Sequence, residues 1–262
     1  MGLFLFSACV GKEMNEVVEE DTTPVLDNFI FHGIEAGKTI SLQGKNLDKL
    51  VWTSSDPFCA TADGGKIHSN HVGFANIYTT GADRFALWVL VSPKYNDYDL
   101  PFVCEPSGQT ALNYYWPSPG QSLWNKGPAT IAAYENTREK DRRSTNSLVV
   151  YKTGNIKSPY VCYFFDNGAL TQAGTIISLS DLSALPFFLK ERYDVISVDT
   201  INYSAYFEHK HFEEGSIDYI GGLQYFPQLG GLLLALMPPT ITKGSNIDMV
   251  MEQMAKELTK II

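Results

Sequence analysis

The sequence lacks the features by which several classes of protein are recognised. Charged residues make up only 19% of the 262 residues, with 20 Lys or Arg against 29 Asp or Glu. The net charge of −9 argues against a nucleic-acid partner, because phosphate binding needs clustered basic side chains. No run of about 18 apolar residues exists, so no helix is expected to span a membrane. The 44% hydrophobic content nevertheless excludes disorder for most of the chain.

Familiar catalytic motifs are missing as well. The chain has no Gly-rich phosphate loop ending in Lys-Ser or Lys-Thr, no Gly-x-Ser-x-Gly elbow and no His-Glu-x-x-His zinc motif. Glu208-His209-Lys210-His211 places two histidines on one side of an expected strand, but no third fixed ligand accompanies them. The sequence therefore predicts no catalytic residue, no metal site and no cofactor.

What is present begins with a short apolar run that ends at a cysteine. Leu5-Phe6-Ser7-Ala8-Cys9 resembles a bacterial lipobox, although no Lys or Arg precedes the run. The resemblance implies that residues 1–9 are the end of a lipoprotein signal and that lipid is attached at Cys9. It further implies that the lipid inserts into a membrane, which would be the outer membrane of the bacterial cell envelope. The protein would then be either periplasmic or surface-exposed.

Residues 10–23 are expected to form an acidic tether. Four glutamates and one aspartate stand there against a single lysine, Lys12, and no aromatic residue is present. Such a segment cannot bury a core, so it is predicted to be a solvated link between the lipid and the folded part. The acids loosely resemble the surface-export signal of Bacteroidota lipoproteins.

Residues 24–93 carry short β-type runs separated by Gly, Asp, Asn and Ser, a pattern typical of a β-sandwich. Ile40 and Leu42 alternate with polar residues and are expected to face the core. Asp63-Gly64-Gly65 is predicted to be a hairpin turn, because its residues tolerate positive φ. The expected strands are Phe29–Ile34, Lys38–Gln43, Lys49–Thr53, Lys66–His68, Ala75–Thr79 and Ala86–Ser92.

An ordered series of segments in this region resembles the bacterial immunoglobulin-like domain, group 2. Its most specific part is Trp52-Thr53-Ser54-Ser55-Asp56-Pro57, and Val72–Ile77 and Leu87–Val91 follow in order. The resemblance implies an all-β immunoglobulin-like sandwich with Trp52 in its core, used as a spacer or adhesive module on a cell surface. Cys59 stands where that family usually has Val, and a small buried hydrophobe serves there equally well.

Residues 94–126 are interpreted as a linker because proline, glycine and asparagine recur in them. They also hold a cluster of aromatic residues that is a candidate ligand platform, since exposed rings stack on sugar faces. The alternative is that these rings pack the two domains together. The cluster consists of Tyr114, Tyr115, Trp116 and Trp124.

Residues 127–262 are predicted to form an α+β domain. A helix is expected over Ala129–Arg143, and two β-β-β-α units follow, with helices from about Ser180 to Tyr193 and from Ser245 to Ile262. An antiparallel sheet with its helices on one face is the expected architecture. The strands are expected near Ser147–Tyr151, Tyr160–Asp166, Thr175–Leu179, Ile201–His209, Ser216–Phe226 and Leu232–Leu236.

Two segments of this domain, Tyr163–Leu170 and Phe188–Tyr193, resemble recurrent elements of Bacteroidota lipoproteins. That resemblance brings no known chemistry. Three cysteines remain besides Cys9: Cys162 is expected to be buried, while a disulfide between Cys59 and Cys104 stays open.

The function predicted from these features is binding or interaction at the bacterial surface, with glycan or protein as the ligand and without nucleic acid. A hydrolase with its site in the α+β domain is the main alternative, and a structural spacer or assembly subunit is a third. An enzyme needs converging titratable groups in one concave pocket, whereas a binding protein does not.

Overall fold

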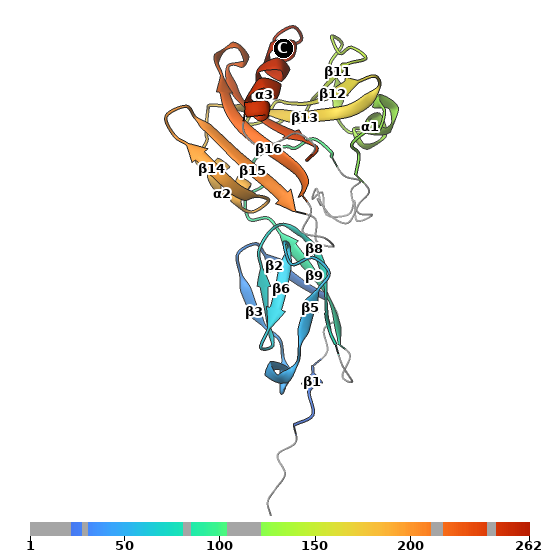
Figure 1. Cartoon of the computed structure of the whole chain (residues 1–262), viewed down its shortest axis with the longest axis vertical. Helices are drawn as coiled ribbons and strands as arrows, with labels where there is room; N and C mark the ends of the chain where they lie inside the picture. Colours follow the sequence, from blue (N-terminus) through green and yellow to red (C-terminus); the bar gives the residue numbers. More distant parts are fainter. Residues whose placement is uncertain (1–21, 28–30, 81–84, 104–121, 211–216, 240–244) are drawn as a thin grey trace, which may run out of the picture.

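The computed structural model describes residues 22–27, 31–80, 85–103, 122–210, 217–239 and 245–262. The protein is rich in β-sheet, with few helices, and forms two lobes stacked along its long axis (Figure 1). The N-terminal lobe comprises residues 25–92, and the C-terminal lobe begins at residue 94. None of the helices in these ranges is long and apolar enough to cross a membrane.

Two small sheets and one strand pair build the N-terminal lobe. β2 pairs with β9 in parallel, and the other strand pairs are antiparallel. One sheet has the order β2 (Phe31–Glu35), β9 (Ala86–Ser92), β8 (Gly73–Thr79) and β5 (Trp52–Ser54). The other has the order β3 (Thr39–Ser41), β7 (Lys66–Ser69) and β6 (Ala60–Asp63), while β1 (Val25–Leu26) pairs with β4 (Gly44–Lys45) and η1 spans Leu47–Lys49.

The core of this lobe follows the alternation of apolar residues along its strands. Ile67, Ile77 and Val89 are fully buried between the sheets. Trp52 is partly buried against the same core, and its indole N–H donates to the carbonyl of Leu47. The predicted hairpin turn is confirmed, because Gly64 and Gly65, between β6 and β7, both have positive φ.

An eight-stranded antiparallel sheet forms the C-terminal lobe. Among the described residues, four strands lie between α1 and α2 and four between α2 and α3, so each unit has one strand more than the predicted β-β-β-α pattern. The strand order is β10 (Glu139–Lys140), β11 (Leu148–Lys152), β12 (Tyr160–Asp166), β13 (Ala169–Ser178), β17 (Gly231–Met237), β16 (Ile217–Phe226), β15 (Ser204–Lys210) and β14 (Asp194–Asp199). The helices are α1 (Pro128–Tyr134), α2 (Leu185–Lys190) and α3 (Ser245–Leu258), with η3 at Pro227–Leu229.

The expectation that the helices lie on one face of this sheet is wrong. Leu234 of β17 belongs to the same core as Phe188 of α2, whereas its neighbour Leu233 belongs to the core that contains Met251 of α3. Because successive strand residues point to opposite faces, α2 and α3 cover opposite sides of the sheet. Every residue of β17 is buried, and a strand that is apolar on both faces needs a cover on each.

All three expected helices are shorter than predicted, and α3 ends at Leu258 in place of Ile262. The first ends at Tyr134, since Glu139 and Lys140 pair with Lys152 and Tyr151 of β11 instead. The second ends at Lys190, and the chain turns there into β14, a strand that was not expected.

The described part of residues 94–126 packs against the C-terminal sheet. Tyr98, Leu100, Val103, Leu123 and Trp124 are buried in one core with α1 and α2. The segment interpreted as a linker therefore adds apolar residues to the C-terminal lobe.

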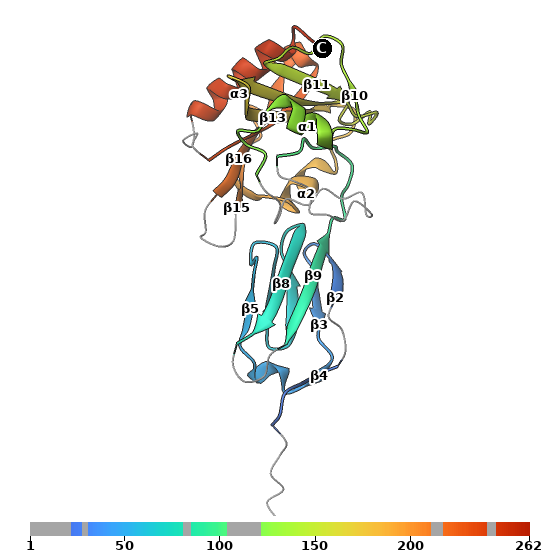
Figure 2. The same cartoon turned by 90° about the vertical axis from the view of Figure 1, so that its right-hand side faces the viewer.

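The lobes meet at the end of α2, which lies at the junction in both views (Figures 1 and 2). The Glu191 carbonyl accepts a hydrogen bond from the Val72 backbone N–H at 2.7 Å. Its carboxylate accepts the backbone N–H groups of Lys94 and Tyr95, each at 3.0 Å. One residue of the C-terminal lobe thus holds both the N-terminal lobe and the segment that leaves it.

Aromatic rings extend the contact between the lobes. Phe58 of the N-terminal lobe stacks on His71, with centroids 3.9 Å apart, and makes a T-shaped contact with His209, with centroids 4.8 Å apart. His209 in turn stacks on Tyr219 of β16. The junction therefore contains packed rings as well as backbone hydrogen bonds.

Candidate functional site

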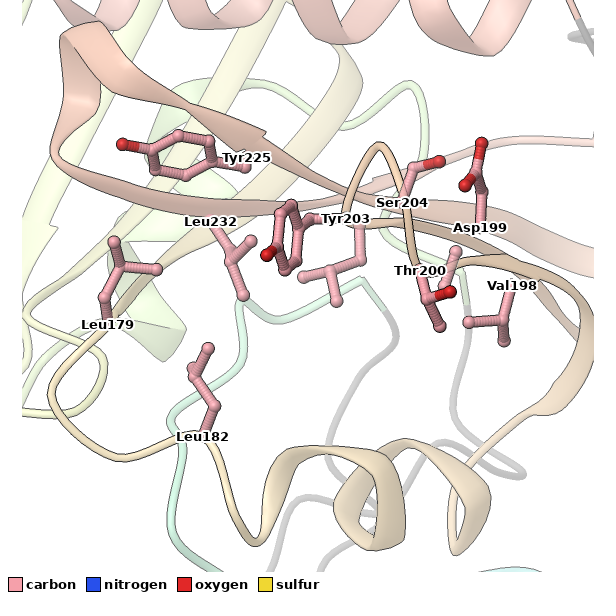
Figure 3. A pocket seen from close by; sticks show the side chains of 11 residues that line it. Leu179, Leu182, Val198, Asp199, Thr200, Tyr203, Ser204, Tyr225 and Leu232 are labelled. Carbon is pink, nitrogen blue, oxygen red and sulfur yellow. The ribbon is translucent and has the colours of Figure 1, made fainter.

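An open apolar pocket lies on the α2 face of the C-terminal sheet (Figure 3). Its volume is about 520 Å³, within the range of ligand sites in proteins. The loop after β13, the β14–β15 hairpin and the strands β16 and β17 supply its walls. Aliphatic side chains and two tyrosines dominate the lining: Leu179, Leu182, Val198, Ala205, Leu223, Leu232, Tyr203 and Tyr225.

The β14–β15 turn positions the tyrosine at the mouth of this apolar pocket. The Asp199 carboxylate accepts the backbone N–H groups of Ile201 and Asn202 and the Asn202 side-chain amide. Tyr203 then adopts a left-handed backbone, φ 50°, before β15 begins. Figure 3 shows its ring facing the same space as Tyr225, Leu232 and Leu182.

The apolar pocket has a buried floor and an exposed rim. Leu223, Leu232 and Ala205 form the floor and belong to the core of the lobe. Val198 is 64% exposed and Tyr203 67% exposed at the rim. Exposed apolar side chains gathered around a concavity are typical of a binding surface.

Titratable groups around the apolar pocket do not form an acid–base pair. Asp199 is the carboxylate among the described lining residues, and hydrogen bonds from Asn202 and Ile201 lower its pKa. Its oxygens are engaged in holding the turn. General acid–base chemistry needs a second group within hydrogen-bond reach of a reacting atom, and the remaining lining residues with titratable groups are the two tyrosines.

A second group of titratable residues is buried beneath α1. The Tyr163 hydroxyl donates to Glu135 at 2.5 Å and accepts the Phe102 backbone N–H at 2.7 Å. Arg138 donates to both Glu135 and Asp99 at 2.9 Å. Burial raises the pKa of Glu135 against the opposing effect of Arg138. These groups tie residues 99–102 to α1 and β12 and do not line the apolar pocket.

The residues predicted as sites are placed differently from the expectation. Trp124 is only 8% exposed and packs in the core, so its ring is not available as a ligand platform. Tyr114, Tyr115 and Trp116 lie outside the described residues, and so does Cys9. The structure therefore brings none of the predicted platform residues to a described surface.

The segment Glu208–His211, considered above as a metal site, has its described histidine packed between aromatic rings. His209 is 1% exposed, in a T-shaped contact with Phe58 and stacked on Tyr219. His211 lies outside the described residues. Among the described ranges, no group of three or more His, Cys, Asp or Glu residues is arranged to hold a metal ion.

The remaining described cysteines are structural. Cys59 and Cys162 are both free thiols and buried, and burial raises the pKa of each. Cys104 lies outside the described residues.

Sequence reasoning missed the apolar pocket. The available signal was the segment from Val195 to Tyr203, in which apolar residues occupy positions that a solvated strand and turn would fill with polar ones. Neither a protein-family model nor a curated protein matches the chain. The case for a function accordingly rests on the geometry of its residues.

Proposed function

We propose that this chain is a lipid-anchored binding protein of the bacterial envelope, and that the apolar pocket takes an apolar side chain of a protein ligand. The observation that carries the proposal is the open cavity of about 520 Å³ whose rim residues Val198 and Tyr203 are mostly exposed. Partner proteins commonly insert one aromatic or aliphatic anchor into such a pocket. The ligand would cover the rim and remove its apolar surface from water.

The architecture supports a display role. We propose an immunoglobulin-like assignment for the N-terminal lobe, supported by its two small sheets, the parallel β2–β9 pair and the buried alternation of β8. We assign the C-terminal lobe to the α+β class. The acidic residues after Cys9 would hold both lobes away from the membrane, and the sandwich would act as the spacer beneath the binding lobe.

Protein is favoured over glycan as the ligand of the apolar pocket. Sugars need several hydrogen-bonding groups besides a stacking ring, and here aliphatic side chains form most of the wall. The hydrolase alternative is weaker, because Asp199 is engaged in its own turn. The spacer alternative gives no role to the exposed rim.

The proposal is tested with the full chain carrying Cys9→Ser and the fluorescent apolar probe N-phenyl-1-naphthylamine. The probe should bind, and Tyr203→Ser should weaken it by about 1–2 kcal/mol, roughly fivefold to thirtyfold, because a ring of the rim is lost. Ala205→Phe, which fills the cavity from its floor, should abolish binding.

The matched control is Ile156→Ser. Ile156 is 82% exposed, like the rim residues, but lies in the turn between β11 and β12 and does not line the apolar pocket. It should leave probe binding unchanged. An equal loss of probe affinity in Ile156→Ser and in Tyr203→Ser would show that the probe does not bind in the apolar pocket.

The anchor has its own test. Labelling with radioactive palmitate in bacteria should be seen in the wild-type chain and lost in Cys9→Ser. Unchanged labelling would contradict the lipid attachment and the envelope location.

A further inference from the structure

A second concavity separates the two lobes and differs in chemistry from the apolar pocket. This junction cleft has a volume of about 730 Å³ and is lined from both sides. The N-terminal lobe contributes Lys38, Thr39 and Asn70, and the C-terminal lobe contributes Pro186 and Lys190. A ligand in the cleft would contact both lobes at once.

The walls of the junction cleft are held in place before any ligand arrives. The hydrogen bond from Val72 to the Glu191 carbonyl lies next to Lys190, and His71, which lines the cleft, is stacked on Phe58. A preformed cleft costs a ligand less ordering entropy than one that must be assembled.

Charge in the junction cleft is opposite to that of the whole chain. Lys38 and Lys190 are exposed, and among the described residues no acid forms an ion pair with either ammonium group. Asp194, the acid in the lining, is 2.7 Å from the Lys210 ammonium and 3.4 Å from His71. Lys38 and Lys190 thus face the concavity without an ion pair to an acid in the described ranges, in a chain of net charge −9.

The rest of the lining has the mixed character that a sugar requires. Thr39 and His68 are hydrogen-bonded to each other at 3.0 Å, and the Asn70 amide donates to the Pro57 carbonyl, so these polar groups are held in place along the lining. Pro186 and Val195 present apolar surface, which suits the C–H face of a pyranose ring. Lysine ammonium groups bind carboxylates as point charges without demanding the paired geometry of arginine.

We infer that the junction cleft binds a carboxylate-bearing saccharide of the uronate class, with Lys38 and Lys190 contacting its carboxylates. The inference is independent of the apolar pocket and of its proposed protein ligand. Because the two lysines come from different lobes, binding should also strengthen the junction.

The experiment measures binding of fluorescein-labelled trigalacturonate to the full chain carrying Cys9→Ser, with labelled galactotriose as the neutral comparison. The acidic sugar should bind at least tenfold more tightly than the neutral one, and its affinity should fall as NaCl rises. Lys38→Gln combined with Lys190→Gln should weaken acidic binding at least tenfold.

The matched control combines Lys45→Gln with Lys49→Gln. These exposed lysines lie in β4 and η1 of the N-terminal lobe, outside the lining of the junction cleft, and remove the same net charge. This control should bind trigalacturonate within twofold of the parent chain.

Three results would overturn the inference. They are equal binding of the neutral sugar, equal weakening in the two double variants, and displacement of trigalacturonate by inorganic phosphate at equal concentration. The last would identify a site for small anions in place of a saccharide site.

Discussion

The backbone N–H of Val72 donates a hydrogen bond to the backbone carbonyl of Glu191 at 2.7 Å, so the two lobes are joined by main chain as well as by side chains. The Glu191 carboxylate meanwhile accepts the N–H groups of Lys94 and Tyr95, where the chain leaves the N-terminal lobe. The main-chain bond to Val72 survives a side-chain substitution at this position, whereas the two carboxylate bonds can be removed by mutation.

Glu191→Ala should loosen the junction while leaving both cores intact. Two hydrogen bonds to a carboxylate are lost, and we expect the free energy of unfolding to fall by about 2 kcal/mol. Small-angle scattering should show a larger radius of gyration, and calorimetry should resolve separate transitions for the lobes. Glu139→Ala is the control, because that carboxylate is 66% exposed and pairs with Lys152 in β11. Identical scattering from the two variants would show that the Glu191 carboxylate does not hold the lobes together.

Acidification should lower the free energy of unfolding, because His71 becomes protonated. Burial lowers the pKa of this imidazole, whose Nδ1 lies 2.8 Å from the Phe58 carbonyl. The folded state therefore disfavours the protonated form, and the unfolded chain binds the proton at higher pH. The contribution is complete above the ordinary histidine pKa of about 6.5 and is lost as the pH falls below it toward the lowered value.

Urea unfolding at pH 7.5 and pH 5.5 measures this effect. The wild-type chain should lose more free energy of unfolding on acidification than His71→Gln loses. His68→Gln, which removes a half-exposed imidazole from the same lobe, should keep the wild-type difference. Equal pH dependence in wild type and His71→Gln would show that this side chain is not responsible.

Tyr163→Phe should destabilise the C-terminal lobe. The hydroxyl is fully buried, and its loss removes the acceptor at 2.7 Å from the Phe102 N–H and one donor to Glu135, which keeps its bonds from Arg138. We expect a loss of about 2–3 kcal/mol in urea unfolding, because buried polar groups that lose their partners pay a desolvation cost. Tyr151→Phe removes a hydroxyl from the neighbouring strand and leaves this pair of bonds in place. Similar losses in the free energy of unfolding in Tyr163→Phe and Tyr151→Phe would argue against a stabilising role for the hydrogen bonds of the Tyr163 hydroxyl.

Gly221→Ala should also be costly. A Cβ at this position in β16 would lie 2.0 Å from the Phe207 ring, which is itself fully buried and stacked on Tyr193. We expect a loss of about 1–3 kcal/mol from the forced repacking. Gly33→Ala in β2 is the comparison, since its Cβ would meet nothing within 4 Å. A thermal melt in which both variants keep wild-type stability would contradict the packing described at β16.

Local patterns were sufficient for most of the strands. β12 spans Tyr160–Asp166 as expected, and β17 is found within one residue of its predicted ends. The hairpin at Gly64 and Gly65 follows from the positive φ that only such residues adopt easily. These features depend on neighbours in sequence, which is why the pattern predicted them.

Features that depend on distant residues were not predictable in the same way. The helices cover opposite faces because β13 and β17 pair at the centre of the sheet and bury both of their sides. The apolar pocket brings Leu182 next to Tyr203 and Leu223, which come together only once the sheet has formed. Trp124 shows the converse, since an aromatic residue in a proline-rich segment became part of the core.

The most direct test of the proposed function is site-specific photocrosslinking in bacteria that display the acylated chain. A benzophenone amino acid at position 203 should give one discrete adduct with a protein, and the adduct should disappear when Ala205→Phe fills the apolar pocket. The same amino acid at position 156, which is more exposed than position 203 but lies outside the apolar pocket, should give none. The same adducts from both positions, or an adduct that survives Ala205→Phe, would contradict a protein ligand seated in the apolar pocket.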